Sequence, residues 1–142
     1  MYVKIVNNSV AKFPYNIGDL KKENPNISFP NPINENALAA FNVYPVTPIA
    51  APEFDSRTHR VIQGVELVDG KWTQKWTLQD LPEEQARANI RAERNRRLIN
   101  SDWTQLSDSS VDSTVWLDYR QALRDITNQA GFPWNINWPT KP

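Results

Sequence analysis

The stretch that organises the chain covers residues 91–142 and reads RAERNRRLINSDWTQLSDSSVDSTVWLDYRQALRDITNQAGFPWNINWPTKP. Its middle carries Trp116, Tyr119, Leu123 and Ile126, which are spaced three, four and three residues apart. Because an α-helix has about 3.6 residues per turn, this spacing places the four side chains on one stripe. The pattern predicts an amphipathic helix that ends before the GFP run, where glycine and proline stop it.

A second helix is predicted just before the first, over residues 82–100. Pro82 suits its first turn, because the missing N–H needs no partner there. Glu83 and Glu84 favour the positive end of the helix dipole, and several arginines favour the negative end. The apolar stripe of this helix is thin, so the helix needs a partner. We therefore expect an antiparallel two-helix hairpin with Trp103 near its closed end.

The last residues, GFPWNINWPTKP, predict an extended tail, because their three prolines exclude a regular helix. Trp134 and Trp138 lie in this tail. A buried aromatic ring removes roughly 150–250 Å² of surface from water, so both rings are costly to leave exposed. The tail either folds back over the helices or keeps its rings for a partner. We favour folding back, since most apolar residues of a soluble domain serve its own core.

Three ordered runs, RxERNRRLxxSDWTQL, YRQALRDI and GFPWNINWP, resemble the C-terminal module of tailed-phage tail assembly chaperones, also known as tail-fibre assembly proteins. That family often has a proline where Ser107 stands here. The front half resembles such proteins more loosely, through FPYNIGDLKKENPNISFP and Tyr44-Pro45-Val46. The resemblance implies a non-enzymatic helper, or accessory subunit, for folding and assembling tail fibres. The matching positions are Arg91, Arg94, Asn95, Leu98, Ser101, Asp102, Trp103, Thr104, Gln105, Leu106, Tyr119, Arg120, Gln121, Leu123, Arg124, Asp125, Ile126, Phe132, Pro133 and Trp138.

The clearest strand signal is RVIQGVELVDGKWTQKWTL at residues 60–78. Asp69-Gly70 indicates a two-residue hairpin turn, because both turn positions need positive φ. Such a turn pairs Leu67 with Trp72 and places every second residue on one largely apolar face that also holds Trp76. We expect this face to be the core of a small sheet, and keep an aromatic docking face as the alternative.

The residues before this hairpin predict a loop-rich β region. Seven of the eleven prolines lie between Pro14 and Pro52, and regular ladders tolerate few prolines. Short strands are expected over 2–6, 10–13 and 41–46, with short helices over 16–24 and 34–40. The predicted fold class is α+β: a small proline-rich β N-terminal region with a β-hairpin, then an antiparallel two-helix hairpin and an extended Trp/Pro tail. The predicted division is a β-rich region over 1–80 and a helical module over 81–142.

Composition disfavours several classes of function. Lys+Arg and Asp+Glu both number 16, so the formal net charge is zero and no strong field draws the chain to nucleic acid or an acidic membrane. There are no cysteines, hence no disulfide and no thiolate metal site. No stretch reaches the roughly 18 apolar residues of a spanning helix. Nothing resembles a signal peptide, so we expect synthesis in the host cytoplasm, with the virion tail as a second location.

No convergent catalytic pattern is present. His59 is the only histidine, and it sits between Arg57 and Arg60 without a Ser/His/Asp or HExxH context. The four glycines are scattered, so no phosphate-cradling loop is formed. We expect no enzymatic activity, no cofactor and no metal.

The arginines of residues 87–97 leave three interpretations open. Glu93 can pair with Arg97 at the i, i+4 spacing, which favours a solvated, ion-paired face. Arginine and tryptophan are also enriched at the hot spots of protein interfaces. Nucleic-acid binding is the least favoured, because the neutral chain has little charge with which to release counterions.

We predict a phage tail-fibre assembly chaperone or fibre-associated protein that binds a tail fibre, or another tail or baseplate protein. The alternatives are a permanent structural subunit of the fibre or baseplate and, third, a nucleic-acid-binding module. Neither a membrane partner nor an established oligomer is implied, although oligomerisation is left open. The predicted protein-binding residues are Trp103, Tyr119, Arg120, Arg124, Trp134 and Trp138.

Overall fold

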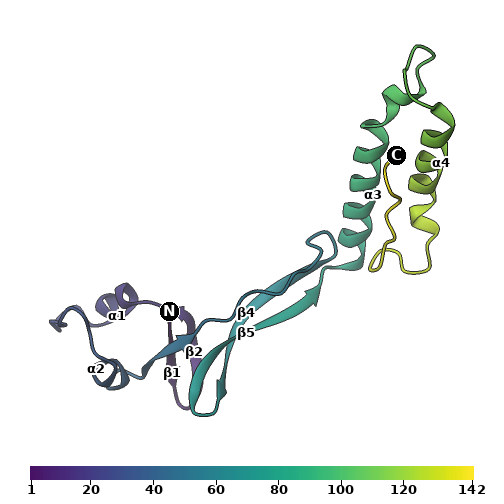
Figure 1. Ribbon diagram of the computed structural model, residues 1–142. Coiled ribbons are helices and arrows are strands. Elements are labelled where there is room, and N and C mark those ends of the chain that lie inside the picture. Colours follow the sequence, from purple (N-terminus) through teal and green to yellow (C-terminus); the bar gives the residue numbers. More distant parts are fainter. The chain divides into compact units, whose positions relative to one another are not determined.

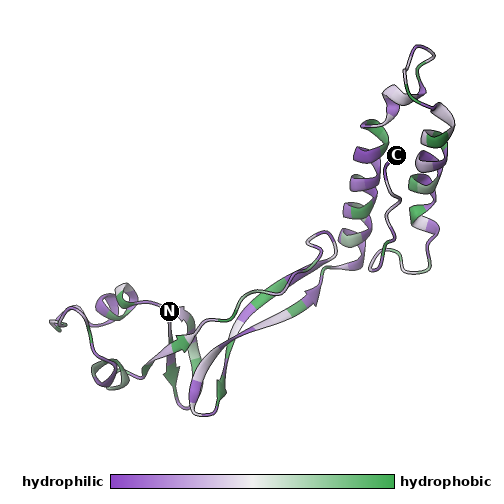
Figure 2. Ribbon diagram, viewed as in Figure 1, coloured by the Kyte–Doolittle hydropathy of each residue, from purple (hydrophilic) through white to green (hydrophobic).

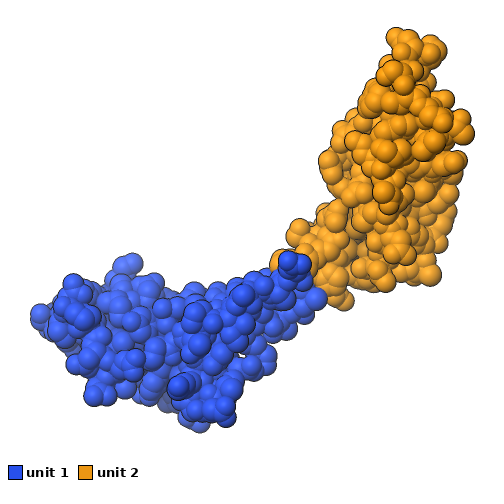
Figure 3. Space-filling view, viewed as in Figure 1, with its two compact units in different colours: residues 1–53, 61–78 blue, residues 54–60, 79–142 orange.

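The computed structural model describes all residues from 1 to 142 (Figure 1). The chain divides into two compact units (Figure 3). Unit 1 consists of residues 1–53 and 61–78, and unit 2 consists of residues 54–60 and 79–142. The expectation that residues 1–80 and 81–142 form separate domains stays a prediction.

Five strands form one mixed sheet in the order β2-β1-β3-β5-β4. The strands are β1 (Tyr2–Val6), β2 (Ser9–Tyr15), β3 (Val43–Thr47), β4 (His59–Val68) and β5 (Lys71–Asp80). β1 pairs antiparallel with both β2 and β3, whereas β3 pairs parallel with β5. The sheet therefore draws on strands from residue 2 to residue 80.

The predicted fold class is wrong. The hairpin is not an appendage of a small β region, because β3 pairs directly with β5, with Val46 opposite Trp72 and Thr47 opposite Thr73. Alternation of apolar residues indicates a strand but not its partner, so this parallel contact left no signal in the sequence. The C-terminal part is also more than two helices and a tail, because two short 3-10 helices join it, η1 (Asp102–Gln105) and η2 (Asp125–Asn128).

The core of unit 1 is formed by Tyr15, Leu20, Leu38 and Val43, which are at most 1% exposed. Two short helices supply part of it, α1 (Ile17–Glu23) and α2 (Glu35–Ala39). Each begins at an asparagine whose side chain accepts a hydrogen bond from a free backbone N–H of the first turn. These caps, together with the burial of Leu20 and Leu38, stabilise helices of only seven and five residues.

The β4–β5 hairpin has the expected turn. Asp69 and Gly70 have φ values of 48° and 75°, as a two-residue turn of this hand requires. The predicted apolar face is covered only at its centre, where Gln74 is buried. At the tip of the hairpin, Leu67 on the same face stays 58% exposed. The segment after β3 provides the cover: Trp76 Nε1 donates to the carbonyl of Ile49 at 2.8 Å, and the Ile49 N–H donates to Gln74 Oε1 at 3.1 Å.

Unit 2 is built on α3 (Glu83–Ile99) and α4 (Ser113–Arg124). In Figure 2 the ribbon of α3 is mostly hydrophilic with a few hydrophobic bands, as the thin stripe predicted. The predicted stripe of α4 and η2 is buried and packs against Ile90 of α3. The tail folds back as expected, and its partly buried Phe132, Ile136 and Trp138 pack against this core.

Replacing a core residue of α4 tests this packing. Leu123→Ala removes a side chain that is 0% exposed. We expect the free energy of unfolding to fall by about 2–5 kcal/mol, since a cavity adds to the lost burial. Leu117→Ala, on the exposed side of the same helix, is the control and should change it by less than about 0.5 kcal/mol. Equal losses in chemical denaturation of the two variants would contradict this assignment of the core.

Candidate protein-binding site

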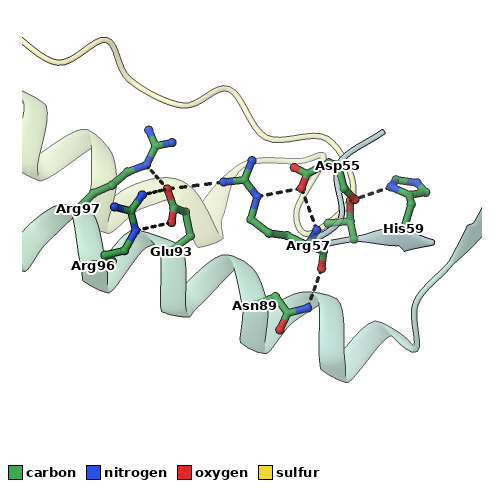
Figure 4. A network of polar contacts seen from close by, with 8 residues as sticks. Asp55, Arg57, His59, Asn89, Glu93, Arg96 and Arg97 are labelled. Carbon is green, nitrogen blue, oxygen red and sulfur yellow. Dashed lines mark hydrogen bonds and ion pairs between the residues drawn. The ribbon is translucent and has the colours of Figure 1, made fainter. Parts of the chain in front are cut away.

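The carboxylate of Glu93 organises the arginine-rich face of α3 (Figure 4). Its two oxygens accept from Arg96 at 2.8 Å each, and Oε1 also accepts from Arg97 Nε at 2.7 Å. Arg57 approaches the same oxygen at 3.6 Å. The hydrogen bonds from Arg96 and the single hydrogen bond from Arg97 lower the pKa of Glu93 to about 2, although partial burial opposes this shift. Glu93 therefore stays ionised and holds its guanidinium groups in place.

Arg57 reaches α3 from the segment that precedes β4. Its Nε donates to Asp55 Oδ1 at 2.8 Å, and its backbone N–H donates to the same oxygen at 2.9 Å. The carbonyl of Arg57 accepts from Asn89 Nδ2 of α3 at 2.9 Å (Figure 4). The segment is thus fastened to α3 by backbone as well as side-chain contacts.

Aromatic rings of the tail pack against arginines of α3 and against Arg57. The guanidinium carbon of Arg97 lies 4.1 Å from the ring centroid of Trp138, and that of Arg57 lies 5.4 Å from it. Arg87 and Arg91 lie 5.1 and 5.7 Å from the ring centroid of Phe132. Guanidinium groups bind aromatic rings through their faces, so these contacts hold the tail against the helix. The arginine cluster is consequently part of the internal architecture of unit 2.

A pocket of about 270 Å³ opens beside this cluster. Trp116 and Tyr119 of α4 form an aromatic wall, with ring centroids 5.7 Å apart and planes perpendicular. The ammonium of Lys141, near the end of the tail, lies 5.7 Å from the ring centroid of Trp116. The residues that line the pocket are Arg96, Arg97, Asn100, Ser101, Trp116, Tyr119 and Lys141.

The pocket and its surroundings carry an excess of positive charge. Arg57, Arg96 and Arg97 share the carboxylates of Asp55 and Glu93, and Lys141 has no carboxylate partner within 4.0 Å. Of the residues that line the pocket, Arg96, Arg97 and Lys141 are cationic and none is anionic. Such a site favours an anionic group, and its aromatic wall offers contact to an apolar stem.

Arg120 lies near the pocket and fixes the chain at the end of α3. Its Nη1 donates to the carbonyl of Leu98 and to Ser101 Oγ, both at 2.7 Å. Its Nη2 pairs with Asp102 at 2.8 Å, and its side chain is 11% exposed. These bonds position η1, which carries Trp103. Arg120 Nε is buried and has no hydrogen-bond partner.

The six predicted binding residues fall into different environments. Trp103 is 48% exposed and its ring centroid lies 6.0 Å from that of Trp116, beside the pocket. Tyr119 is in the pocket wall and Arg120 supports the turn next to it. The ring of Trp138 packs against the guanidinium group of Arg97. Arg124 is exposed, and its Nη1 donates a hydrogen bond to Gln121 Oε1 at 3.2 Å.

Trp134 belongs to the other end of the module. It is 37% exposed, and its ring centroid lies 6.0 Å from that of His59. Trp103 lies just beyond the last residue of α3, and the 17 residues of that helix span about 25 Å. The structure therefore gathers Trp103, Tyr119 and Arg120 at one end and leaves Trp134 apart. The role of all six in binding stays a prediction.

Sequence reasoning missed Lys141, Asn100 and the Asp55–Arg57 pair. Lys141 joins the pocket only because the tail folds back along the helices, and its isolated position near the end gives no pattern. Arg57 lies outside the helical segments and contacts Glu93 across more than thirty positions of sequence. The sequence held one indication that the tail contacts α3. Arginines cluster in residues 87–97 and two tryptophans lie in the tail, a combination suited to cation–π contact.

His59 has structural neighbours. Its Nε2 lies 3.2 Å from Asp80 Oδ1, and its Nδ1 lies 2.7 Å from Thr58 Oγ1.

No group of three or more His, Cys, Asp or Glu side chains is placed to hold a metal ion. No helix has both the length and the apolar character needed to cross a bilayer.

The lowered pKa of Glu93 predicts a pH dependence of stability. The folded chain favours the carboxylate, so its contribution is complete above the ordinary value of 4.5 and is lost as pH falls towards about 2. Glu93→Gln should lower the free energy of unfolding at pH 7, and its difference from the unmodified chain should shrink between pH 5 and pH 3. Urea denaturation at each pH measures this, with Glu84→Gln on the same helix as control. A pH-independent difference would contradict the assigned role.

Comparison with known proteins gives one match. No curated protein and no solved structure matches the chain. Residues 87–142, which contain most of α3, α4, the pocket and the tail, match the family model described as phage tail assembly chaperone protein. The resemblance of the C-terminal module is thereby confirmed, and this module carries the sequence pattern of the phage tail assembly chaperones. The looser resemblance of the front half stays a prediction.

Proposed function

We propose that this protein is a non-enzymatic chaperone of phage tail assembly that binds a tail fibre or baseplate protein through its C-terminal module. One observation carries the proposal. The cationic pocket walled by Trp116 and Tyr119, with Trp103 exposed beside it, lies within the residues that match the family. The partner contributes an acidic side chain or a terminal carboxylate to the pocket, and an apolar surface to the ring of Trp103.

The chemistry of the site supports this partner. An anionic group entering the pocket meets guanidinium groups that are already held by Glu93, so little side-chain freedom is lost on binding. The indole of Trp103 rests against Trp116 and is supported by η1, which Arg120 anchors. A partly exposed tryptophan that packs on a second aromatic ring beside charged groups has the character of an interface hot spot.

The benefit to the partner is protection before assembly. Chains rich in β-strands expose unpaired edges and apolar faces until they associate, and these surfaces aggregate. A protein that occupies part of such a surface keeps the chain soluble and is released when subunits pair. We place this event in the host cytoplasm, and we expect the chaperone to be absent from purified particles when their proteins are identified by mass spectrometry.

Trp103 is the first residue to test. We expect Trp103→Ala to weaken binding to the tail fibre protein of the same phage by about thirtyfold, in line with a hot spot of at least ~2 kcal/mol. Isothermal titration calorimetry measures the change. Leu117→Ala is the matched control, because Leu117 has the same exposed fraction of 48% and lies outside the pocket lining.

The consequence for assembly is measured by co-expression. The fibre gene is expressed alone, with the chaperone, and with Trp103→Ala, and soluble trimer is quantified. We expect more soluble trimer only with the unmodified chaperone. Equal yields in all three cultures would overturn the proposed function.

Charge at the pocket gives a second test. Lys141→Glu reverses one positive charge at the mouth, and we expect binding to weaken by about tenfold at low salt and less at high salt. Lys21→Glu on α1 makes the same change of net charge outside the pocket and should leave affinity unchanged. Equal effects of the two variants would show that total charge, and not the pocket, governs binding.

A further inference from the structure

The two edges of the sheet in unit 1 differ in their protection against pairing. β2 forms one edge and carries Lys12 and Pro14, and its register with β1 shifts twice. Lysine, proline and bulges are the usual features that keep an edge from pairing with another chain. β4 forms the other edge over ten residues and has neither lysine nor proline. The protein thus blocks one edge and leaves the longer one open.

The turn defines which backbone groups of β4 are free. Val68 and Lys71 flank a two-residue turn and therefore form a hydrogen-bonded pair. Pairs of this kind recur at every second residue, so the even-numbered residues of β4 direct their N–H and C=O groups to β5. Gly64 then lies opposite Lys75. A Cβ atom added to Gly64 would lie 3.9 Å from the carbonyl oxygen of Lys75, which fits this pairing. The free edge consequently presents the backbone groups of Val61, Gln63, Val65 and Leu67.

The sequence of β4 is complementary to itself in the antiparallel direction. When two copies are aligned with Gln63 opposite Gln63, both of these residues present free backbone groups, as an antiparallel ladder requires. Val61 then faces Val65, and Arg60 faces Glu66 of the other copy. Residues directly opposite in a ladder project to the same face, so the opposite charges meet twice, once on each side of the two-fold axis.

In the same alignment, an exposed apolar side chain of β4 is covered by the second copy. Ile62 is 46% exposed and faces Gly64 of the other copy. Gly64 has no side chain, and its ideal Cβ position has no other atom within 4 Å except that carbonyl. An isoleucine of a second copy can therefore cover the glycine, which removes apolar surface from water without a clash.

We propose that β4 pairs antiparallel with β4 of a second copy, centred on Gln63, so that two sheets join into one across a two-fold axis. The pairing is held by backbone bonds at the free edge, by the Arg60–Glu66 contacts and by Ile62 over Gly64. Within one chain Arg60 bonds Gln79 at 2.9 Å and Glu66 pairs with Lys75 at 2.7 Å. Both of these contacts are exposed, so the side chains of Arg60 and Glu66 can each bind a second side chain from the other copy. The interface uses no residue of the C-terminal pocket, so it stands or falls independently of the proposed function.

Exchanging the charges tests the alignment. Arg60→Glu places two carboxylates opposite each other at both contacts, and Glu66→Arg places two guanidinium groups there. Each single variant should weaken self-association by about tenfold, because two attractive contacts become repulsive. In a mixture, the introduced glutamate of one variant faces the introduced arginine of the other, and the unmodified Arg60 and Glu66 face each other. A heterodimer of near-original affinity should therefore form. Sedimentation equilibrium over about a hundredfold range of concentration measures the association.

Val65→Pro provides an independent test. It removes a free-edge N–H that β5 does not use, so the hairpin should remain while the dimer is lost. Circular dichroism and thermal denaturation verify the fold of each variant. A monomer at every concentration of the unmodified chain would overturn the proposal. So would a dimer that survives Val65→Pro and both charge reversals, or single variants that fail to associate when mixed although each is folded.

Discussion

The contact between the Trp138 indole and the guanidinium groups of Arg57 and Arg97 is the interaction on which unit 2 depends. It joins three segments that are distant in sequence: the approach to β4, the end of α3 and the tail. The contact in turn needs Glu93, whose carboxylate keeps Arg97 and Arg57 from repelling each other. Without the tail, the thin apolar stripe of α3 would have only α4 to cover it.

This arrangement explains why the pocket exists where it does. Because the tail returns along the helices, Lys141 comes to lie beside Trp116 and closes a space that α3 and α4 leave open between their polar residues. The cations of the pocket are therefore held by contacts within the chain itself. Arg120 has the corresponding role at η1, where it holds the turn that displays Trp103.

The sequence predicted those elements whose signals are local. The stripe of Trp116, Tyr119, Leu123 and Ile126 located α4 and its core, and Asp69-Gly70 located the hairpin turn. The wrong fold class came from a contact that is not local. β3 and β5 pair through a few residues far apart along the chain, and apolar alternation is the same whichever strand lies alongside.

The candidate site was predictable to a similar degree. Tyr119 was singled out from its stripe and Trp103 from its place near the closed end of the helices, and both are at the pocket. Arg57 and Lys141 were not, because only tertiary folding brings a loop and the tail near α3. The role of Trp138 in binding a partner stays a prediction, and its ring lies against two arginines of its own chain.

The discontinuity of unit 2 decides which continuous stretch of the chain holds all of its contacts. Residues 54–60 belong to it structurally although they precede the family-matching region and are separated from α3 by the hairpin. A fragment limited to residues 87–142 would lack Asp55 and Arg57, and with them one cation at the Trp138 ring and one neighbour of Glu93. The shortest continuous segment that preserves this architecture therefore starts near residue 54 and carries the hairpin within it.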